Sequence, residues 1–127
     1  MINTDPHGRV IGFAYHDGCV AGVALEADGK RVRIWLRSSS GQENVLVLAG
    51  VRALSVDGLR EGNIVHAIRL HPIAEARVQF DVPPLVQARL GLDVGTLPVD
   101  EFVFLLEPSY GADFVAVCGD VELNPRP

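Results

Sequence analysis

Three residues near the start of the chain could form a nucleophilic site. His16, Asp17 and Cys19 offer a base, an orienting carboxylate and a thiol, the set that a cysteine nucleophile requires. Side chains alternate across a strand, however, so Asp17 and Cys19 would lie on one face and His16 on the other. A turn at Asp17-Gly18 followed by a buried Cys19 explains the same residues. We therefore predict no catalytic residues and no enzymatic activity.

Histidines elsewhere in the chain raise the question of a metal site. His66 and His71 could join His16 as ligands, but they are five positions apart and form no HxH or HxxxH pair. His66 alternates with Ile64 and Ile68, which favours a core histidine with a hydrogen-bond partner. We therefore expect no metal and no cofactor. A small-ligand- or metal-binding protein, or an enzyme, that uses these histidines remains the alternative.

One stripe of side chains suggests a binding surface. Arg31, Arg33, Trp35 and Arg37 occupy alternate positions of one strand-like run, so they share a face. Arginine and tryptophan are enriched at protein interfaces, and arginine can stack on an indole ring. An ordinary solvated strand face, with Trp35 partly covered by a neighbouring segment, would give the same pattern. The stripe is our candidate partner-binding site.

The elements that position this stripe begin with a hairpin at residues 15–36. Asp28-Gly29 supplies the positive φ of a tight turn. After it, Val32, Ile34 and Leu36 alternate with the stripe and predict a buried face. In the first strand, Gly22 indicates a bulge or close packing against another element.

The remaining chain reads as short strands separated by turns. Strands are expected at residues 10–14, 43–49, 51–56, 63–70, 101–107, 114–118 and 121–123, with 43–49 apolar enough to be covered on both sides. Residues 73–80 are ambiguous between strand and helix, and one short helix is expected over residues 84–90, closed by Gly91. The prediction is a mainly β, single domain over residues 1–127: an antiparallel sandwich or partly open barrel of about seven to nine strands. Residues 1–8 would be a loose leader and 124–127 a tail.

Composition narrows the classes of function. The chain has 127 residues and a formal net charge of -5, which argues against nucleic-acid binding. Residues 72–127 carry three basic and nine acidic residues, which is either chance or an acidic face for a basic partner. We see no export signal, no apolar run of membrane-spanning length and no disulfide framework, so a cytoplasmic protein is expected. Ten of the eleven basic residues are arginine, a bias associated with GC-rich bacteria.

The order of turns and strands over residues 15–70 resembles a group of small bacterial β domains. The pattern consists of His16-Asp17-Gly18, Asp28-Gly29, the apolar run 45–56 around Gly50, and residues 60–64. Some of these domains are similar to immunity proteins of polymorphic toxin systems. That resemblance implies a non-enzymatic protein that binds another protein. A structural homo-oligomer, such as a homodimer, is the other alternative.

Overall fold

Alternating apolar residues form strands through most of the chain. The structure is a computed structural model, and it describes residues 2–26 and 28–125. Within these residues the strands are β1 (Asn3–Thr4), β2 (Val10–Ile11), β3 (Cys19–Leu25), β4 (Arg31–Arg37), β5 (Glu43–Ala49), β6 (Ala53–Asp57), β7 (Ile64–Pro72), β8 (Phe102–Tyr110), β9 (Asp113–Cys118) and β10 (Asp120–Leu123). The helices are α1 (Ile73–Ala76), α2 (Val82–Leu90) and the 3-10 turn η1 (Val94–Thr96). The predicted mainly β class is confirmed.

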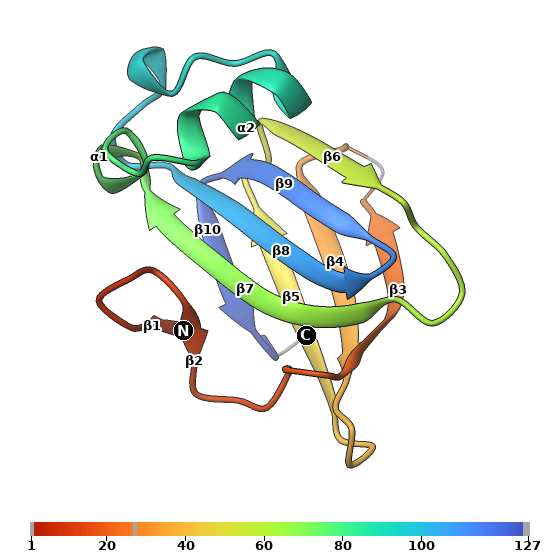
Figure 1. Cartoon of the computed structure of the whole chain (residues 1–127). Coiled ribbons are helices and arrows are strands. Elements are labelled where there is room, and N and C mark those ends of the chain that lie inside the picture. Colours follow the sequence, from red (N-terminus) through yellow and green to blue (C-terminus); the bar gives the residue numbers. More distant parts are fainter. Residues whose placement is uncertain (1, 27, 126–127) are drawn as a thin grey trace.

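Eight strands form one antiparallel sheet in the order β10-β5-β4-β3-β7-β8-β9-β6. The sheet folds over on itself where β5 leads into β6 and β9 leads into β10, as Figure 1 shows. At this corner the Gly119 N–H donates to the carbonyl oxygens of Ala49 at 2.9 Å and Gly50 at 3.2 Å. Gly50 has φ +60°, which glycine adopts without a steric penalty. The result is a partly open barrel, because β3 pairs with β7 only at Cys19 and Ile64.

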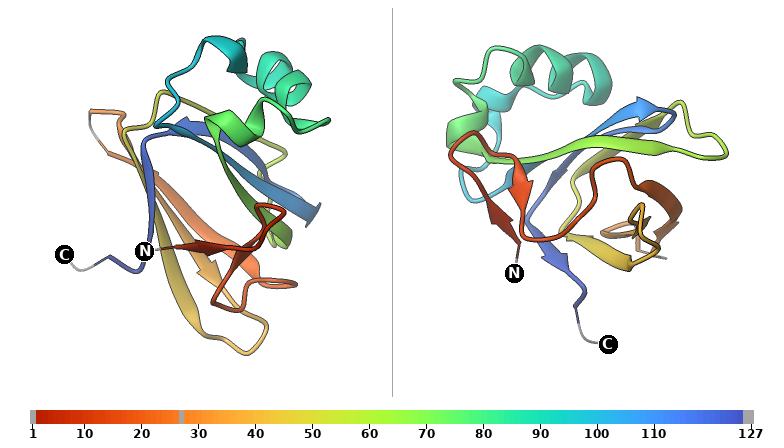
Figure 2. Two further views of the ribbon diagram at one scale, coloured as in Figure 1. Left: turned by 90° about the vertical axis from the view of Figure 1, so that its left-hand side faces the viewer. Right: turned by 60° about the horizontal axis from the view of Figure 1, so that its bottom comes forward.

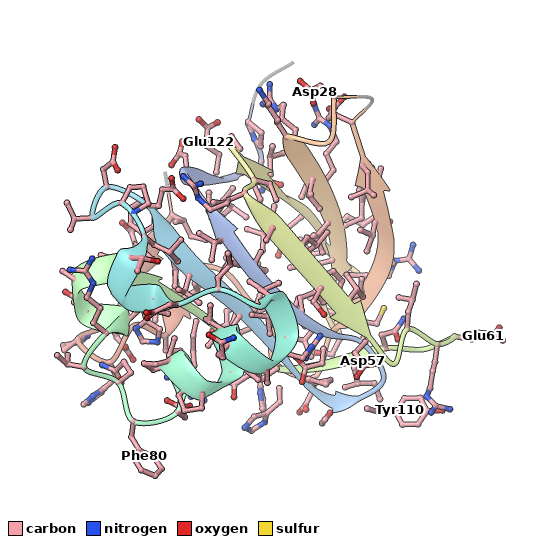
Figure 3. The ribbon with its side chains drawn as sticks, turned by 90° about the horizontal axis from the view of Figure 1, so that it is seen from above. Asp28, Asp57, Glu61, Phe80, Tyr110 and Glu122 are labelled. Carbon is pink, nitrogen blue, oxygen red and sulfur yellow. The ribbon has the colours of Figure 1, made fainter. Side chains whose placement is uncertain are left out.

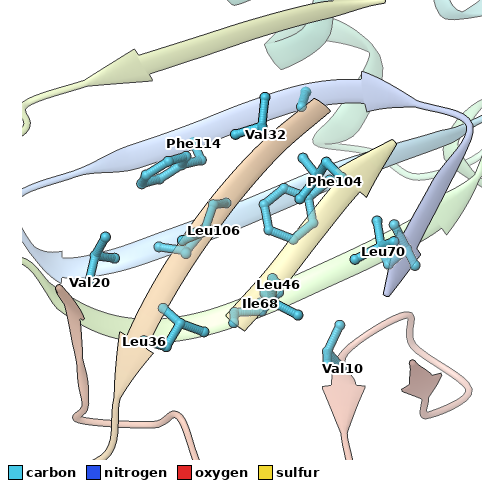
Figure 4. Packing of buried hydrophobic residues seen from close by; sticks show 14 of the residues in the cluster. Val10, Val20, Val32, Leu36, Leu46, Ile68, Leu70, Phe104, Leu106 and Phe114 are labelled. Carbon is cyan, nitrogen blue, oxygen red and sulfur yellow. The ribbon is translucent and has the colours of Figure 1, made fainter. Parts of the chain in front are cut away.

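The main core fills the space between the two halves of the sheet. Phe104 and Phe114 come from one half, Ile34 and Leu46 come from the other, and all are fully buried. Figure 4 shows Phe104, Phe114 and Leu46 within the layer between the facing strands. Burial of these apolar side chains holds the two halves of the sheet together.

A second core lies on the outer face of β8 and β9. Val103 and Leu105 of β8 and Val115 and Val117 of β9 pack under α1, α2 and η1. Figure 2 shows these helices gathered on one side of the sheet. Arg89 fastens α2 to the sheet through an ion pair to Asp113 at 3.0 Å. β8 and β9 are therefore buried on both faces. The strand over residues 43–49, which was predicted to be covered on both sides, has no helix over its outer face, but Val47 in its middle points outward and is still only 1% exposed.

Several boundaries differ from the sequence predictions. α2 begins at Val82, two residues before the predicted start, with prolines in its first turn, and it ends at Gly91 with φ 68° as expected. The ambiguous segment 73–80 contains the single-turn helix α1.

An ion pair joins the start of α2 to the sheet: Asp81, which precedes α2, pairs with Arg69 of β7 at 2.7 Å.

The first and last segments that the structure describes are hydrogen-bonded to neighbouring strands, which was not expected of a loose leader and a tail. Residues 3–4 of the predicted loose leader form β1, which pairs with β2, and the Leu70 N–H donates to the Gly8 carbonyl at 2.8 Å. In the predicted tail, the Asn124 side chain accepts a hydrogen bond from the Val45 N–H at 2.7 Å. Residues 126–127 lie outside the described part of the chain.

Removing a core ring should test the packing of the two halves. Phe104→Ala is expected to lower the free energy of unfolding by about 3–5 kcal/mol, because a large buried ring leaves a cavity. Urea denaturation followed by the fluorescence of Trp35, the one tryptophan in the sequence, measures it. Tyr110→Ala, at an exposed position of the same strand, is the control and should change stability by about 0.5 kcal/mol or less. Equal losses in both variants would contradict this account of the core.

Candidate partner-binding face

The outer surface of β3, β4, β5 and β10 is the face of the sheet that α1 and α2 leave bare, since both helices pack on the β6 to β9 half. Strand alternation puts Val32, Ile34 and Leu36 into the core, so the other side chains of β4 point outward. We call this surface the open face. Its residues, taken from the strand register, are Cys19, Gly22, Ala24, Arg31, Arg33, Trp35, Arg37, Glu43, Val45, Val47, Ala49, Asp120 and Glu122. The predicted stripe thus lies on one face, as expected.

Trp35 lies at the centre of the open face. It pairs with Gly22 on β3 and Val45 on β5. A Cβ at Gly22 would lie 3.5 Å from Cε3 of Trp35, so the indole ring covers the glycine. The register also shifts between Val20 and Gly22, which is the predicted bulge. Trp35 is therefore half-buried by its own sheet and still presents indole surface outward.

The arginines of the stripe are partly neutralised by neighbouring carboxylates. Arg33 pairs with Glu26 at 3.2 Å, and Arg37 pairs with Glu43 at 2.9 Å. The hydrogen bond from Arg37 to Glu43 raises the pKa of this guanidinium above its usual value. Exposed pairs of this kind contribute little to stability, so the arginines can exchange partners at low cost.

Charge on the open face changes sign from one strand to the next. Arg31 and its neighbours lie on β4, whereas Asp120 and Glu122 lie on β10 at the edge of the sheet. Between them β5 contributes Val45, which is half-buried, and Val47, which is only 1% exposed. The face therefore has an apolar centre flanked by basic and acidic strips.

Two of the candidate histidines meet at the surface. The rings of His16 and His66 are 5.4 Å apart, edge to face, and His16 Nδ1 lies 2.8 Å from the His66 carbonyl oxygen. Both rings are exposed beside a cleft of about 420 Å³ lined also by Phe13 and Tyr15. The prediction that His66 lies in the core is wrong. Bulges flanking Val65 shift the alternation of β7, so Val65 points inward where the sequence pattern placed Ile64 and His66.

His71 lies apart from that pair, in the interior. It is 1% exposed, and neither ring nitrogen has a hydrogen-bond partner among the described residues. Gly8 lies directly against the imidazole, where a Cβ would overlap the ring. Burial, and then the nearby charge of Arg69, lowers the pKa of His71 below its usual value.

The structure brings two residues of the predicted nucleophilic set together, because His16 Nε2 and Asp17 Oδ1 lie 3.6 Å apart. Within residues 2–26 and 28–125, no group of three His, Cys, Asp or Glu side chains is placed to hold a metal ion. Asp17 lies in a turn with φ 62°, closed by a hydrogen bond from the Gly18 N–H to the Tyr15 carbonyl. Cys19 is half-buried on β3 opposite Arg37, whereas Cys118 is fully buried and its pKa is raised by burial to about 12.

The sequence pattern did not predict two exposed apolar residues. Val78 and Phe80 follow α1 and are 81% and 98% exposed. Figure 3 shows Phe80 projecting away from the helices. Their segment has neither a period of two nor a helical period, so the sequence did not indicate which of its side chains would be buried.

Comparison with known proteins finds a similar fold but gives no information about function. No known protein family and no curated protein matches the sequence. A solved structure of an uncharacterized protein from Neisseria gonorrhoeae is similar, with a TM-score of 0.53 and 7% identity; the match covers 88% of this chain and 94% of that one. At this identity the likeness concerns the fold alone. In the described residues, none of the helices has the length and apolar character needed to cross a membrane.

Acidification should destabilise the protein through His71. Its folded pKa lies below the ordinary value of 6.5, so the unfolded chain takes up the proton first. The stability from neutral His71 is full above about pH 6.5 and decreases as the pH falls toward the folded pKa. His71→Phe, which has no ionisable nitrogen, should therefore lose less stability than the wild type between about pH 7 and about pH 5.

The midpoints of urea denaturation of the wild type and of His71→Phe, measured across this pH range, give the loss of stability of each protein. His66→Phe is the matched control, because His66 is exposed, and it should keep the wild-type pH dependence. If the wild type and His71→Phe lose stability in parallel, the role assigned to buried His71 is wrong.

Proposed function

We propose that this chain is a non-enzymatic protein-binding module, immunity-like in that its task is to occupy the surface of another protein. The observation that carries the proposal is the open face: one half of the sheet is covered by α1, α2 and η1, and the other half carries Trp35 uncovered by any helix.

The composition of the open face supports this role. Interfaces commonly have an apolar centre within a polar rim, and tryptophan and arginine contribute much of their binding energy. Here Trp35 and Val45, both half-buried, form the centre, and Arg33 and Arg37 lie beside them. The backbone beneath Trp35 is set by strand pairing on both sides, so little ordering is needed on binding.

The charges on the face indicate what the partner presents. Its surface would offer an apolar patch for Trp35, carboxylates toward the arginines of β4, and basic side chains toward Asp120 and Glu122 of β10. The partner's carboxylates would then compete with Glu26 and Glu43 for the arginines.

A homodimer through the same face is the second candidate. A two-fold axis can place the arginines of one copy against Asp120 and Glu122 of the other, because the two strips carry opposite charge. Light scattering on the purified protein at tens of micromolar separates the two candidates. A dimer that Trp35→Ala dissociates would favour the second.

Truncating Trp35 tests the first candidate. Wild type, Trp35→Ala and the control Tyr110→Ala, each with intact fold by circular dichroism, are immobilised and exposed to native lysate of the source cells. The proteins retained by the wild type are identified and purified, and their affinities are measured. Trp35→Ala should bind the partner at least tenfold more weakly, the effect of losing about 1.4 kcal/mol or more at a central tryptophan, and Tyr110→Ala should match the wild type.

An unchanged affinity of Trp35→Ala would remove the open face from the proposal. If the captured partner is a toxin, an equimolar amount of the wild-type chain should abolish its activity, as an immunity-like role requires.

A further inference from the structure

β3 has a free edge over most of its length. It pairs with β4 from Cys19 to Leu25, but with β7 only through Cys19 and Ile64. On the β7 side the last backbone hydrogen bond among the described residues runs from the Val20 N–H to the Asn63 carbonyl, at 2.9 Å. The N–H and C=O groups of residues 21–25 that point away from β4 are therefore available to another strand.

The side chains along this edge are apolar and incompletely covered. After the bulge between Val20 and Gly22, Val23 pairs with Ile34, and Leu25 pairs with Val32. Both partners on β4 are fully buried, so Val23 and Leu25 are on the inward side of the sheet. Leu25 is nevertheless 65% exposed, because nothing among the described residues pairs with this edge and covers it.

A fixed loop forms the opposite wall. Residues 59–63, between β6 and β7, line a cleft of about 460 Å³ together with residues 19–23 of β3 and Arg37. Leu59 is 60% exposed there. The buried side chain of Asn63 holds the loop: its Oδ1 accepts from the backbone N–H of Arg60 at 2.7 Å and of Ala112 at 3.0 Å. Figure 1 shows this loop running beside β3.

We propose that this cleft binds an extended peptide segment of a partner protein, which adds to residues 21–25 of β3 as a new strand. The unpaired main-chain groups along the edge can form hydrogen bonds with another peptide backbone. Exposed Leu25 and Leu59 would pack against apolar side chains of that peptide. The wall formed by residues 59–63 lies opposite residues 19–23 of β3, and the free edge continues beyond the cleft to Leu25. The cleft shares Cys19, Gly22 and Arg37 with the open face but includes neither Trp35 nor any residue of β5 or β10, so the proposal goes beyond the proposed function and does not depend on it.

Cys19 makes binding measurable before any partner is known. It lines the cleft and is half-buried, whereas Cys118 is fully buried with a raised pKa and should remain unreactive. A phage-displayed library of random heptapeptides is selected against the full chain, and the recovered peptides are made synthetically. We expect peptides with apolar residues at alternate positions, which slow the alkylation of Cys19 by iodoacetamide.

Backbone methylation then tests strand pairing directly. Alternate N–H groups of an added strand face β3, so N-methylation in one register should weaken the peptide at least tenfold, and methylation in the other register should be tolerated. Leu59→Asp and Leu25→Asp should also weaken binding at least tenfold. Val99→Asp, at a position 64% exposed outside the cleft, is the matched control and should bind as the wild type does.

The result for Trp35→Ala separates this proposal from the previous one, because that variant should bind the peptides with wild-type affinity. The proposal is overturned if no recovered peptide protects Cys19, if both methylation registers are tolerated, or if Val99→Asp loses as much affinity as Leu59→Asp.

Discussion

The packing of two halves of one sheet against each other depends on the corner at Gly50 and Gly119. Two strand pairs turn there together, β5 with β10 and β6 with β9, so the inner faces of both halves meet over Phe104 and Phe114. The Gly119 N–H keeps the corner closed by donating to the carbonyls of Ala49 and Gly50. A sheet that folds over in this way has two outer faces, and each must be either covered or able to face water.

Helices cover one of those two outer faces and leave the other without a covering layer. α1, α2 and η1 supply a second core over Val103, Leu105, Val115 and Val117. The opposite outer face is left with side chains that tolerate water: ion-paired arginines, carboxylates, small residues and one tryptophan. Trp35, with Val45 beside it on β5, is the exception to that pattern, because part of the apolar surface of its half-buried indole remains in contact with solvent. The proposal of a binding role rests on this asymmetry.

Local features of the fold could be predicted from the sequence, and long-range ones could not. Asp28-Gly29 and the alternation around Ile34 specify a hairpin through turn chemistry and a period of two, and the structure contains it. The bulges that move His66 to the surface depend on how β7 pairs with β8, which periodicity does not encode. Likewise, the carboxylates that neutralise Arg33 and Arg37 could not be assigned, because such pairs form only once the strands and turns are in place.

Site-specific crosslinking tests most directly whether the open face is where a partner binds. A photoreactive phenylalanine analogue is placed at Val45, beside Trp35, or at Val99, an exposed position away from the open face, and each variant is irradiated in the source cells. The account predicts one defined adduct with another protein from position 45 and none of that adduct from position 99. No adduct from position 45, or the same adduct from both positions, would contradict it.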